Sequence, residues 1–204
     1  MIKNKIKRGA RVTRYYIYKE TLIDFREHVW SFIGAFAGIM LIALTQTFFV
    51  SRLENIFLIG SFGASCVLIY GAIQSPLAQP RNLVGGHVIA AIIGVTVFKL
   101  LPDILWLTAP LAVSLSIVAM QMTKTLHPPG GATALIAVIG TEKVKALGYF
   151  YVLSPVLTGC LILLLVALVC NNATPHRKYP SKSKFIKRWE QKRARRKRMR
   201  DLQK

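Results

Sequence analysis

Long runs without charged residues are the feature that most constrains the fold of this chain. Residues 30–50, 104–122 and 149–170 contain no charge, and residues 85–101 contain only Lys99. A helix of 21 residues, such as 30–50, rises about 30 Å and matches the hydrocarbon core of a bilayer. The four runs therefore predict four membrane-spanning helices.

Two further apolar stretches are too short or too irregular to be ordinary spans. Residues 55–72 are interrupted by Gly-Ser-Phe-Gly-Ala-Ser at 60–65, and residues 132–140 follow a Pro- and Gly-rich stretch at 123–131. The expected fold is an all-α, polytopic transmembrane helical bundle with four full spans plus two short broken or re-entrant segments. Four crossings with two re-entrant segments and six crossings with two broken helices both remain open.

The basic residues lie mainly outside these apolar runs. The chain has 204 residues, is 53% hydrophobic and carries a net charge of +20, with Lys and Arg crowded near both ends. Because Lys and Arg accumulate on the cytoplasmic side, we expect both termini in the cytoplasm and the protein in the cytoplasmic (inner) membrane. The predicted parts are a basic segment with an interfacial helix (1–29), a transmembrane domain (30–170) and a basic tail (171–204).

Basic tails also indicate partners. Attraction to anionic lipid headgroups adds to the topological role. Neither tail has an RNA-binding motif with interleaved aromatic residues, so nucleic acid is not the first choice. The small core is compatible with a homo-oligomer.

A faint internal repeat relates the two irregular segments. Residues 63–68 resemble residues 131–136, and each follows a long span and precedes another. The pattern indicates an internal two-fold repeat of span, broken segment and span, with inverted halves. Chance similarity between small-residue membrane segments is the alternative. Interrupted helices at matching positions of two halves are typical of transporter binding sites.

The broken segments carry a pattern suited to anions. The start of a helix offers unpaired N–H groups and partial positive charge, and glycine lets a ligand approach them. Pro128 and Pro129 are predicted to form the structural turn that starts such a helix. The predicted binding residues here are Ser61, Gly63, Ser65, Gly130, Gly131 and Thr133. The alternative is that these glycines only allow close helix packing.

Ionisable residues flank the same segments. Arg81 and Lys124 are predicted to supply positive potential at the cytoplasmic mouth, although both would also snorkel to the interface as ordinary anchors. His127 would hold the turn or carry a coupled proton. For His87, a hydrogen bond in helix packing is the simpler interpretation.

Enzymatic and metal chemistry find little support. The chain has no P-loop and no H-E-x-x-H, C-x-x-C or G-x-S-x-G motif. A metal would have to use His87 and His127 with few carboxylates, which is a poor ligand set. We therefore expect no enzyme, no cofactor and no metal site.

Two sequence blocks resemble a known family. Residues 126–135 read LHPPGGATAL, and residues 59–86 read IGSFGASCVLIYGAIQSPLAQPRNLVGG. Together they resemble the HPP family of small membrane proteins, named for the motif found here at His127-Pro128-Pro129, over roughly residues 30–170. The resemblance implies four transmembrane helices and, from plastid and cyanobacterial relatives, nitrite transport. Some bacterial members carry a soluble regulatory domain, where this chain has a basic tail.

The function expected from sequence is a transporter or channel for a small anion, with nitrite preferred. The alternative is a membrane-anchored binding or scaffold protein whose basic tail engages anionic lipid or RNA. A membrane enzyme using His87 and His127 is a third interpretation. Passive flux, proton coupling and exchange all remain open.

Overall fold

The computed structural model describes residues 25–49 and 59–181, where the chain forms helices and no strand. Four helices are long and apolar enough to cross a membrane: α2 (Phe25–Phe49), α4 (Pro80–Leu100), α5 (Leu105–Met122), and η3 (Val152–Leu157) continued by α8 (Thr158–Cys170). They confirm the all-α bundle with four full spans. Most of the predicted basic segment (1–29) and most of the predicted tail (171–204) lie outside the described residues.

Two shorter apolar helices lie between these spans. One is α3 (Gly60–Cys66), which continues into the π-helical turn η1 (Val67–Gly71), and the other is α6 (Pro128–Ile139). Each has 12 residues, which is about 18 Å at 1.5 Å per residue. Helix α6 begins ahead of the apolar run 132–140, because Pro128 and Pro129 occupy its first turn, where a missing N–H is tolerated.

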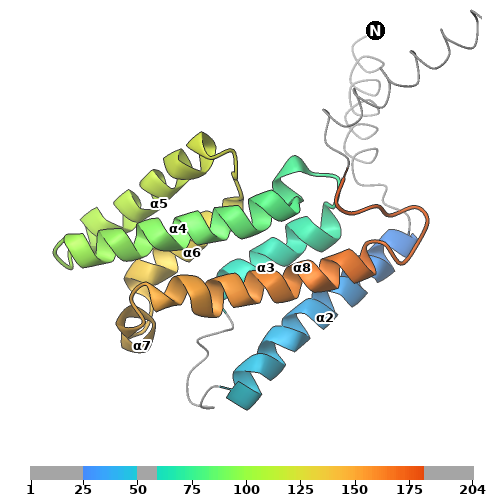
Figure 1. The fold of residues 1–204 in the computed structure, drawn as a ribbon, viewed down its shortest axis with the longest axis horizontal. Helices are drawn as coiled ribbons and strands as arrows, with labels where there is room; N and C mark the ends of the chain where they lie inside the picture. Colours follow the sequence, from blue (N-terminus) through green and yellow to red (C-terminus); the bar gives the residue numbers. More distant parts are fainter. Residues whose placement is uncertain (1–24, 50–58, 182–204) are drawn as a thin grey trace, which may run out of the picture.

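The bundle has two distinct ends (Figure 1). The start of α2, the end of α8 and the connection from α3 to α4, which includes the 3₁₀ turn η2 (Pro76–Ala78), lie together at what we call the strap end. Helix α7 (Glu142–Ala146) marks the opposite end, called the α7 end. An ion pair of 3.5 Å between Arg177 Nε and Glu27 Oε2 joins the two described termini at the strap end.

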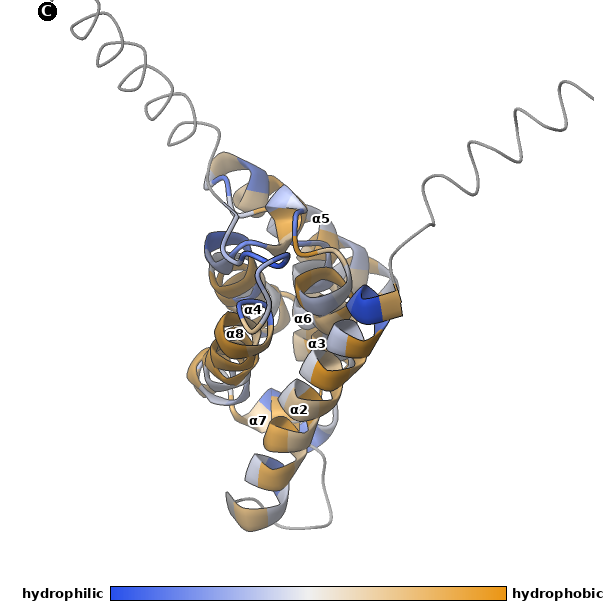
Figure 2. Cartoon of the chain, turned by 90° about the vertical axis from the view of Figure 1, so that its right-hand side faces the viewer, coloured by the Kyte–Doolittle hydropathy of each residue, from blue (hydrophilic) through white to orange (hydrophobic). Residues whose placement is uncertain are grey.

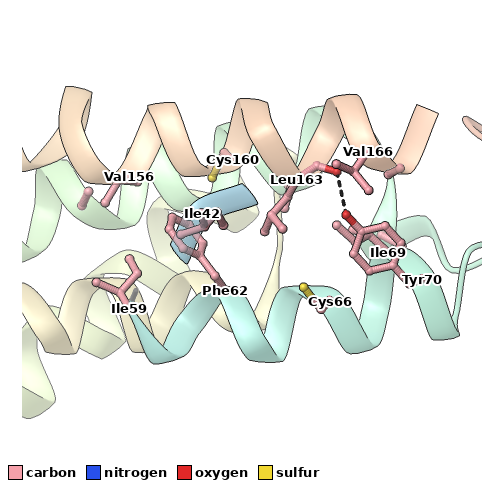
Figure 3. Close-up of a cluster of buried hydrophobic side chains, with 14 of the residues drawn as sticks. Ile42, Ile59, Phe62, Cys66, Ile69, Tyr70, Val156, Cys160, Leu163 and Val166 are labelled. Atoms are coloured by element: carbon pink, nitrogen blue, oxygen red, sulfur yellow. Dashed lines mark hydrogen bonds between the residues drawn. The ribbon is translucent and has the colours of Figure 1, made fainter. Parts of the chain in front are cut away.

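Neither short helix turns back: α3 runs toward the strap end, and α6 runs away from it. Helix α3 runs parallel to α8: Phe62 lies against Gly159, and the Tyr70 hydroxyl donates to the carbonyl of Leu163 at 3.0 Å (Figure 3). Helix α6 runs parallel to α4, because its start is held by Asn82 and its middle lies against Gly94. The structure therefore favours six passes through the bundle over two re-entrant segments.

The outer faces are apolar, as a lipid environment requires. Phe32 and Phe36 on α2 and Trp106 on α5 are 59–78% exposed. Helices α2 and α8 are hydrophobic along most of their length, and the most hydrophilic residues lie at helix ends and connections (Figure 2). The interior is a cluster shared by α2, α3 and α8, including Ile42, Phe62 and Leu163 (Figure 3). A smaller cluster lies between α4, α5 and α6.

Glycines bring α4 and α6 into close contact. A Cβ added to Gly94 would lie 2.5 Å from the carbonyl oxygen of Ala134, and one added to Gly86 would lie 2.8 Å from that of Thr125. On the other side, a Cβ on Gly130 would lie 3.0 Å from the carbonyl oxygen of Gly86. Small residues at such positions let helix backbones approach in membranes.

The segment that follows α8, residues 171–181, packs against the strap end, and we call it the strap. Arg177 is 2% exposed, and its Nη2 donates to the carbonyl of Tyr70 at 2.6 Å. Asn171 Nδ2 donates to the carbonyl of Ile69 at 2.7 Å, and the Tyr179 hydroxyl donates to that of Ala78 at 2.7 Å. Burial raises the pKa of the Tyr179 phenol, which keeps its proton available for this bond. The strap thus donates hydrogen bonds to carbonyl groups of η1 and η2.

Replacing Gly94 with Ala should destabilise the bundle. Helix propensity alone favours Ala over Gly by about 1 kcal/mol. At Gly94 the methyl group meets backbone, and overpacking of this kind costs about 1–3 kcal/mol. Gly63→Ala is the matched control, because nothing lies within 4 Å of an added Cβ there. Thermal unfolding in detergent should show a lower midpoint for Gly94→Ala only; equal midpoints would mean that α4 and α6 are not held this closely.

Arg177→Met should weaken the strap end, whereas Lys178→Met should not. The first change leaves the Tyr70 carbonyl with one donor fewer, and a hydrogen bond to a charged group contributes about 1.5–3 kcal/mol. Lys178 is exposed and adjacent. Proteolysis of the strap in detergent measures the difference, and equal protection of the two variants would contradict the role given to Arg177.

Candidate functional site

Five buried polar side chains meet where α3, α4 and α6 come together. Each is at most 1% exposed, and none of them is an acid. They are Ser61 and Ser65 of α3, His87 of α4, and His127 and Thr133 at the start and in the second turn of α6. We call them the histidine cluster. Polar and ionisable groups inside a membrane domain are expensive to bury, which makes them candidates for functional positions.

Ser65 lies at the centre of the histidine cluster. Its Oγ is 2.7 Å from Nε2 of His87 and 3.0 Å from Nε2 of His127. The two imidazole rings are 4.9 Å apart between centroids, at an interplanar angle of 60°. One hydroxyl group therefore joins two histidines that come from different helices.

The second nitrogen of His87 continues the chain of hydrogen bonds. Its Nδ1 is 2.6 Å from Oγ1 of Thr133, and the hydroxyl oxygens of Thr133 and Ser61 are 2.9 Å apart. The Tyr151 hydroxyl donates to the carbonyl of Thr133 at 3.1 Å and fixes this turn of α6. His87 is thus held between a hydroxyl from each short helix.

Local structure explains how these residues come together. His127 precedes a proline and is therefore extended (φ −142°, ψ 105°), which directs its ring away from α6 and lets Nδ1 bond the carbonyl of Leu77 at 2.9 Å. Ser61 and Ser65 are four residues apart and share one face of α3. Ser65 Oγ also lies 3.0 Å from the carbonyl of Ser61.

The backbone N–H groups of the predicted site are engaged elsewhere. Pro128 and Pro129 have no N–H, and the N–H of Gly130 donates to the carbonyl of His127 at 2.8 Å. Helix α3 begins at Gly60, so Gly63 and Ser65 lie inside it, where N–H groups bond carbonyls one turn back. The structure thus brings together side chains of the predicted residues rather than bare N–H groups.

The remaining predicted residues lie outside the histidine cluster. Gly63 is exposed, and a Cβ on Gly131 would touch only Val113, at 3.8 Å. Arg81 and Lys124 are exposed at the strap end. Arg81 Nη2 donates to the carbonyl of Thr123 at 2.6 Å, and Lys124 adopts φ 57° where the chain leaves α5. In the described residues no three His, Cys, Asp or Glu side chains form a group suited to a metal ion.

His87 was not among the predicted binding residues, although it contacts both short helices. The internal repeat could have indicated that His87 belongs to the site. Ser65 and Thr133 occupy equivalent places in the segments 63–68 and 131–136, and both lie within hydrogen-bonding distance of His87. A lone histidine within an apolar span was the second signal.

Known proteins are similar in sequence to most of this chain. Two proteins of Dictyostelium discoideum, both named transmembrane proteins, are 48% and 45% identical to it over 160 residues, 77% of its length. The chain covers about half of these relatives, 51% and 56% of their lengths. No solved structure matches it. The family described as HPP, transmembrane region, matches residues 20–180, including every residue of the histidine cluster. The chain therefore belongs to the HPP family of membrane proteins.

Proposed function

We propose that this protein carries a small anion, by preference nitrite, across the membrane past the histidine cluster. The observation that carries the proposal is the composition of that cluster. Hydroxyl and imidazole groups gather at the contact of three helices that run between the two ends of the bundle, and no carboxylate accompanies them.

The distribution of charge favours an anion over a cation. The acidic residues of the described chain are Glu27, Asp103 and Glu142, which lie in the first turns of α2 and α7 or in a connection. A cation inside the bundle would lack the carboxylate partners that buried cations require. An anion would meet O–H and N–H donors, which hydrogen-bond negative charge strongly.

Positive residues lie at both ends of the path. Arg81 and Lys124 are exposed at the strap end, and Lys99, Lys143 and Lys145 lie toward the α7 end. Charges of one sign around an entrance raise the local concentration of oppositely charged solutes. Because the histidine cluster is buried, a substrate reaches it only when α3 or α6 shifts, as in other transporters with gated sites.

The preference for nitrite comes from the resemblance to plastid and cyanobacterial members of the family. Nitrite is small and presents two oxygen acceptors, which suit paired hydroxyl and imidazole donors. The start of α2 and the strap share one end of the bundle. We propose that this end faces the cytoplasm, because the basic residues of the two termini directly precede and follow it in the sequence.

Ser65→Ala should lower nitrite uptake into liposomes containing the purified protein, whereas Ser116→Ala should not. Both serines are 0% exposed, but within the described residues the Ser116 hydroxyl bonds the carbonyl of Val113 in its own helix and no other group. Losing one hydrogen bond of ~1 kcal/mol at the site lowers the rate about fivefold, and losing the link between two histidines lowers it further.

Nitrite uptake into liposomes that contain the wild-type protein should exceed uptake into protein-free liposomes. Nitrate, formate and chloride are tested in parallel. Equal uptake by Ser65→Ala and Ser116→Ala would place the substrate path away from the histidine cluster. No uptake of any of these anions by the wild-type protein would contradict the proposed function.

Two truncations separate transport from a scaffold role of the tail. A chain ending at Ser181 keeps Arg177 and Tyr179, so its uptake should remain near that of the full chain. A chain ending at Asn172 loses both side chains. Each buried carbonyl left without its donor costs about 1–3 kcal/mol of stability, so uptake by this chain should fall. A scaffold that acts through residues 182–204 predicts that function is already lost in the chain ending at Ser181.

A further inference from the structure

The direction of one hydrogen bond in the histidine cluster is fixed. Nδ1 of His127 faces the carbonyl oxygen of Leu77, which accepts only, so this nitrogen carries a proton. In a neutral imidazole the other nitrogen, Nε2, is then an acceptor. The partner of this Nε2 is Ser65, whose hydroxyl has a single proton and three acceptors within 3.0 Å: the two histidines and the carbonyl of Ser61.

The neutral cluster is one proton short. The hydroxyl of Thr133 donates to Ser61, so Nδ1 of His87 donates to Thr133, and Nε2 of the neutral His87 ring is an acceptor. The single proton of Ser65 then faces Nε2 of both histidines and can bond only one of them.

One more proton completes the cluster. When it is bound at Nε2 of His127, this nitrogen donates to Ser65, and Ser65 donates its own proton to Nε2 of His87. His127 now donates from both nitrogens, to Ser65 and to Leu77, and is an imidazolium. Every hydrogen bond in the chain from Ser61 to His127 then has one donor and one acceptor, and transfer through the Ser65 hydroxyl moves the additional positive charge between the two rings.

The surroundings leave this proton without a fixed counter-charge. Titratable groups on the packed elements are thiols and phenols rather than acids: Cys66 of α3, Cys160 of α8, and Tyr151, whose hydroxyl bonds the Thr133 carbonyl. The charged residues of α4 stand at or near its two ends, Arg81 and Lys99, and Lys124 follows α5. In the described residues, α5 and α6 carry no charge between their bounds.

We infer that the hydrogen-bonded chain Ser61–Thr133–His87–Ser65–His127 is a proton-binding site that holds one exchangeable proton, and that this proton crosses the membrane with the substrate anion. The first half stands on the geometry of the histidine cluster. The second half rests on the proposed function and selects proton-coupled transport from the three modes that the sequence leaves open.

Nitrogen-15 NMR of histidine side chains in the full-length protein tests the proton site without transport. The four histidines are assigned through His28→Asn and His176→Asn, which alter exposed residues, and through His87→Gln and His127→Asn. As the pH is lowered from about 8 to about 4, through the range of imidazole titration and below it, the signals of His87 and His127 should change together as one proton is taken up. In Ser65→Ala the joint change should disappear. Separate titration of the two rings in the wild-type protein, or one proton on each throughout, would overturn the proton site.

Liposomes test the coupling. An anion that moves with a proton carries no net charge, so nitrite uptake by the wild-type protein should not respond to valinomycin and potassium. In His127→Asn the amide still donates to the Leu77 carbonyl but cannot titrate, so uptake should become dependent on valinomycin; His176→Asn should behave as wild type. Wild-type uptake that requires valinomycin would overturn coupling. If the wild-type protein moves no anion, the proposed function fails, and the NMR result still decides the proton site.

Discussion

The structure depends on side chains that satisfy the carbonyl groups at the ends of the two short helices. Helices of 12 residues leave part of a ~30 Å bilayer to be crossed by irregular backbone, and no lipid group can bond that backbone. Each exposed carbonyl therefore needs a donor from the protein. Arg177 and Ser31 donate to Tyr70, Asn82 donates to Leu126, and His127 faces Leu77. The strap and the histidine at the HPP motif both provide donors to backbone carbonyls where the short helices are interrupted.

This requirement explains why the cluster lies where it does. His127 is drawn out of helical conformation by Pro128 and is held by the Leu77 carbonyl, which leaves its second nitrogen directed at α3. Ser65 and Thr133, equivalent in the internal repeat, converge on the same His87 from opposite sides. Together with α3 running along α8 and α6 along α4, this convergence supports an inverted relation between the halves. The residues that satisfy the backbone at the helix breaks are thus also residues of the candidate binding site.

Part of this arrangement is readable from the sequence. The four long spans can be predicted from apolar runs that are long enough to cross a membrane, and Pro128 indicates the start of α6. The direction of the short helices cannot be predicted from the sequence, because an apolar run of 12 residues is compatible with a segment that turns back and with one that continues. That choice is made by tertiary partners such as Gly94 against Ala134. Likewise, Arg177 resembles any other residue of a basic tail in the sequence, and its contacts with the Tyr70 carbonyl and with Glu27 distinguish it from Lys178 only in the structure.

A titratable pair would suit the proposed anion path better than a fixed charge. A permanently charged Lys or Arg at the position of His87 would be costly to bury in an apolar domain and would hold an anion after it arrived. A cluster of neutral donors without a cation would bind the anion but leave its charge uncompensated in a medium of low dielectric. With the proposed shared proton, His87 and His127 would avoid both difficulties, because the proton would supply positive charge when the anion is present and leave with it. A fixed negative charge beside the pair would retain that proton, and the interior of the described spans carries no carboxylate.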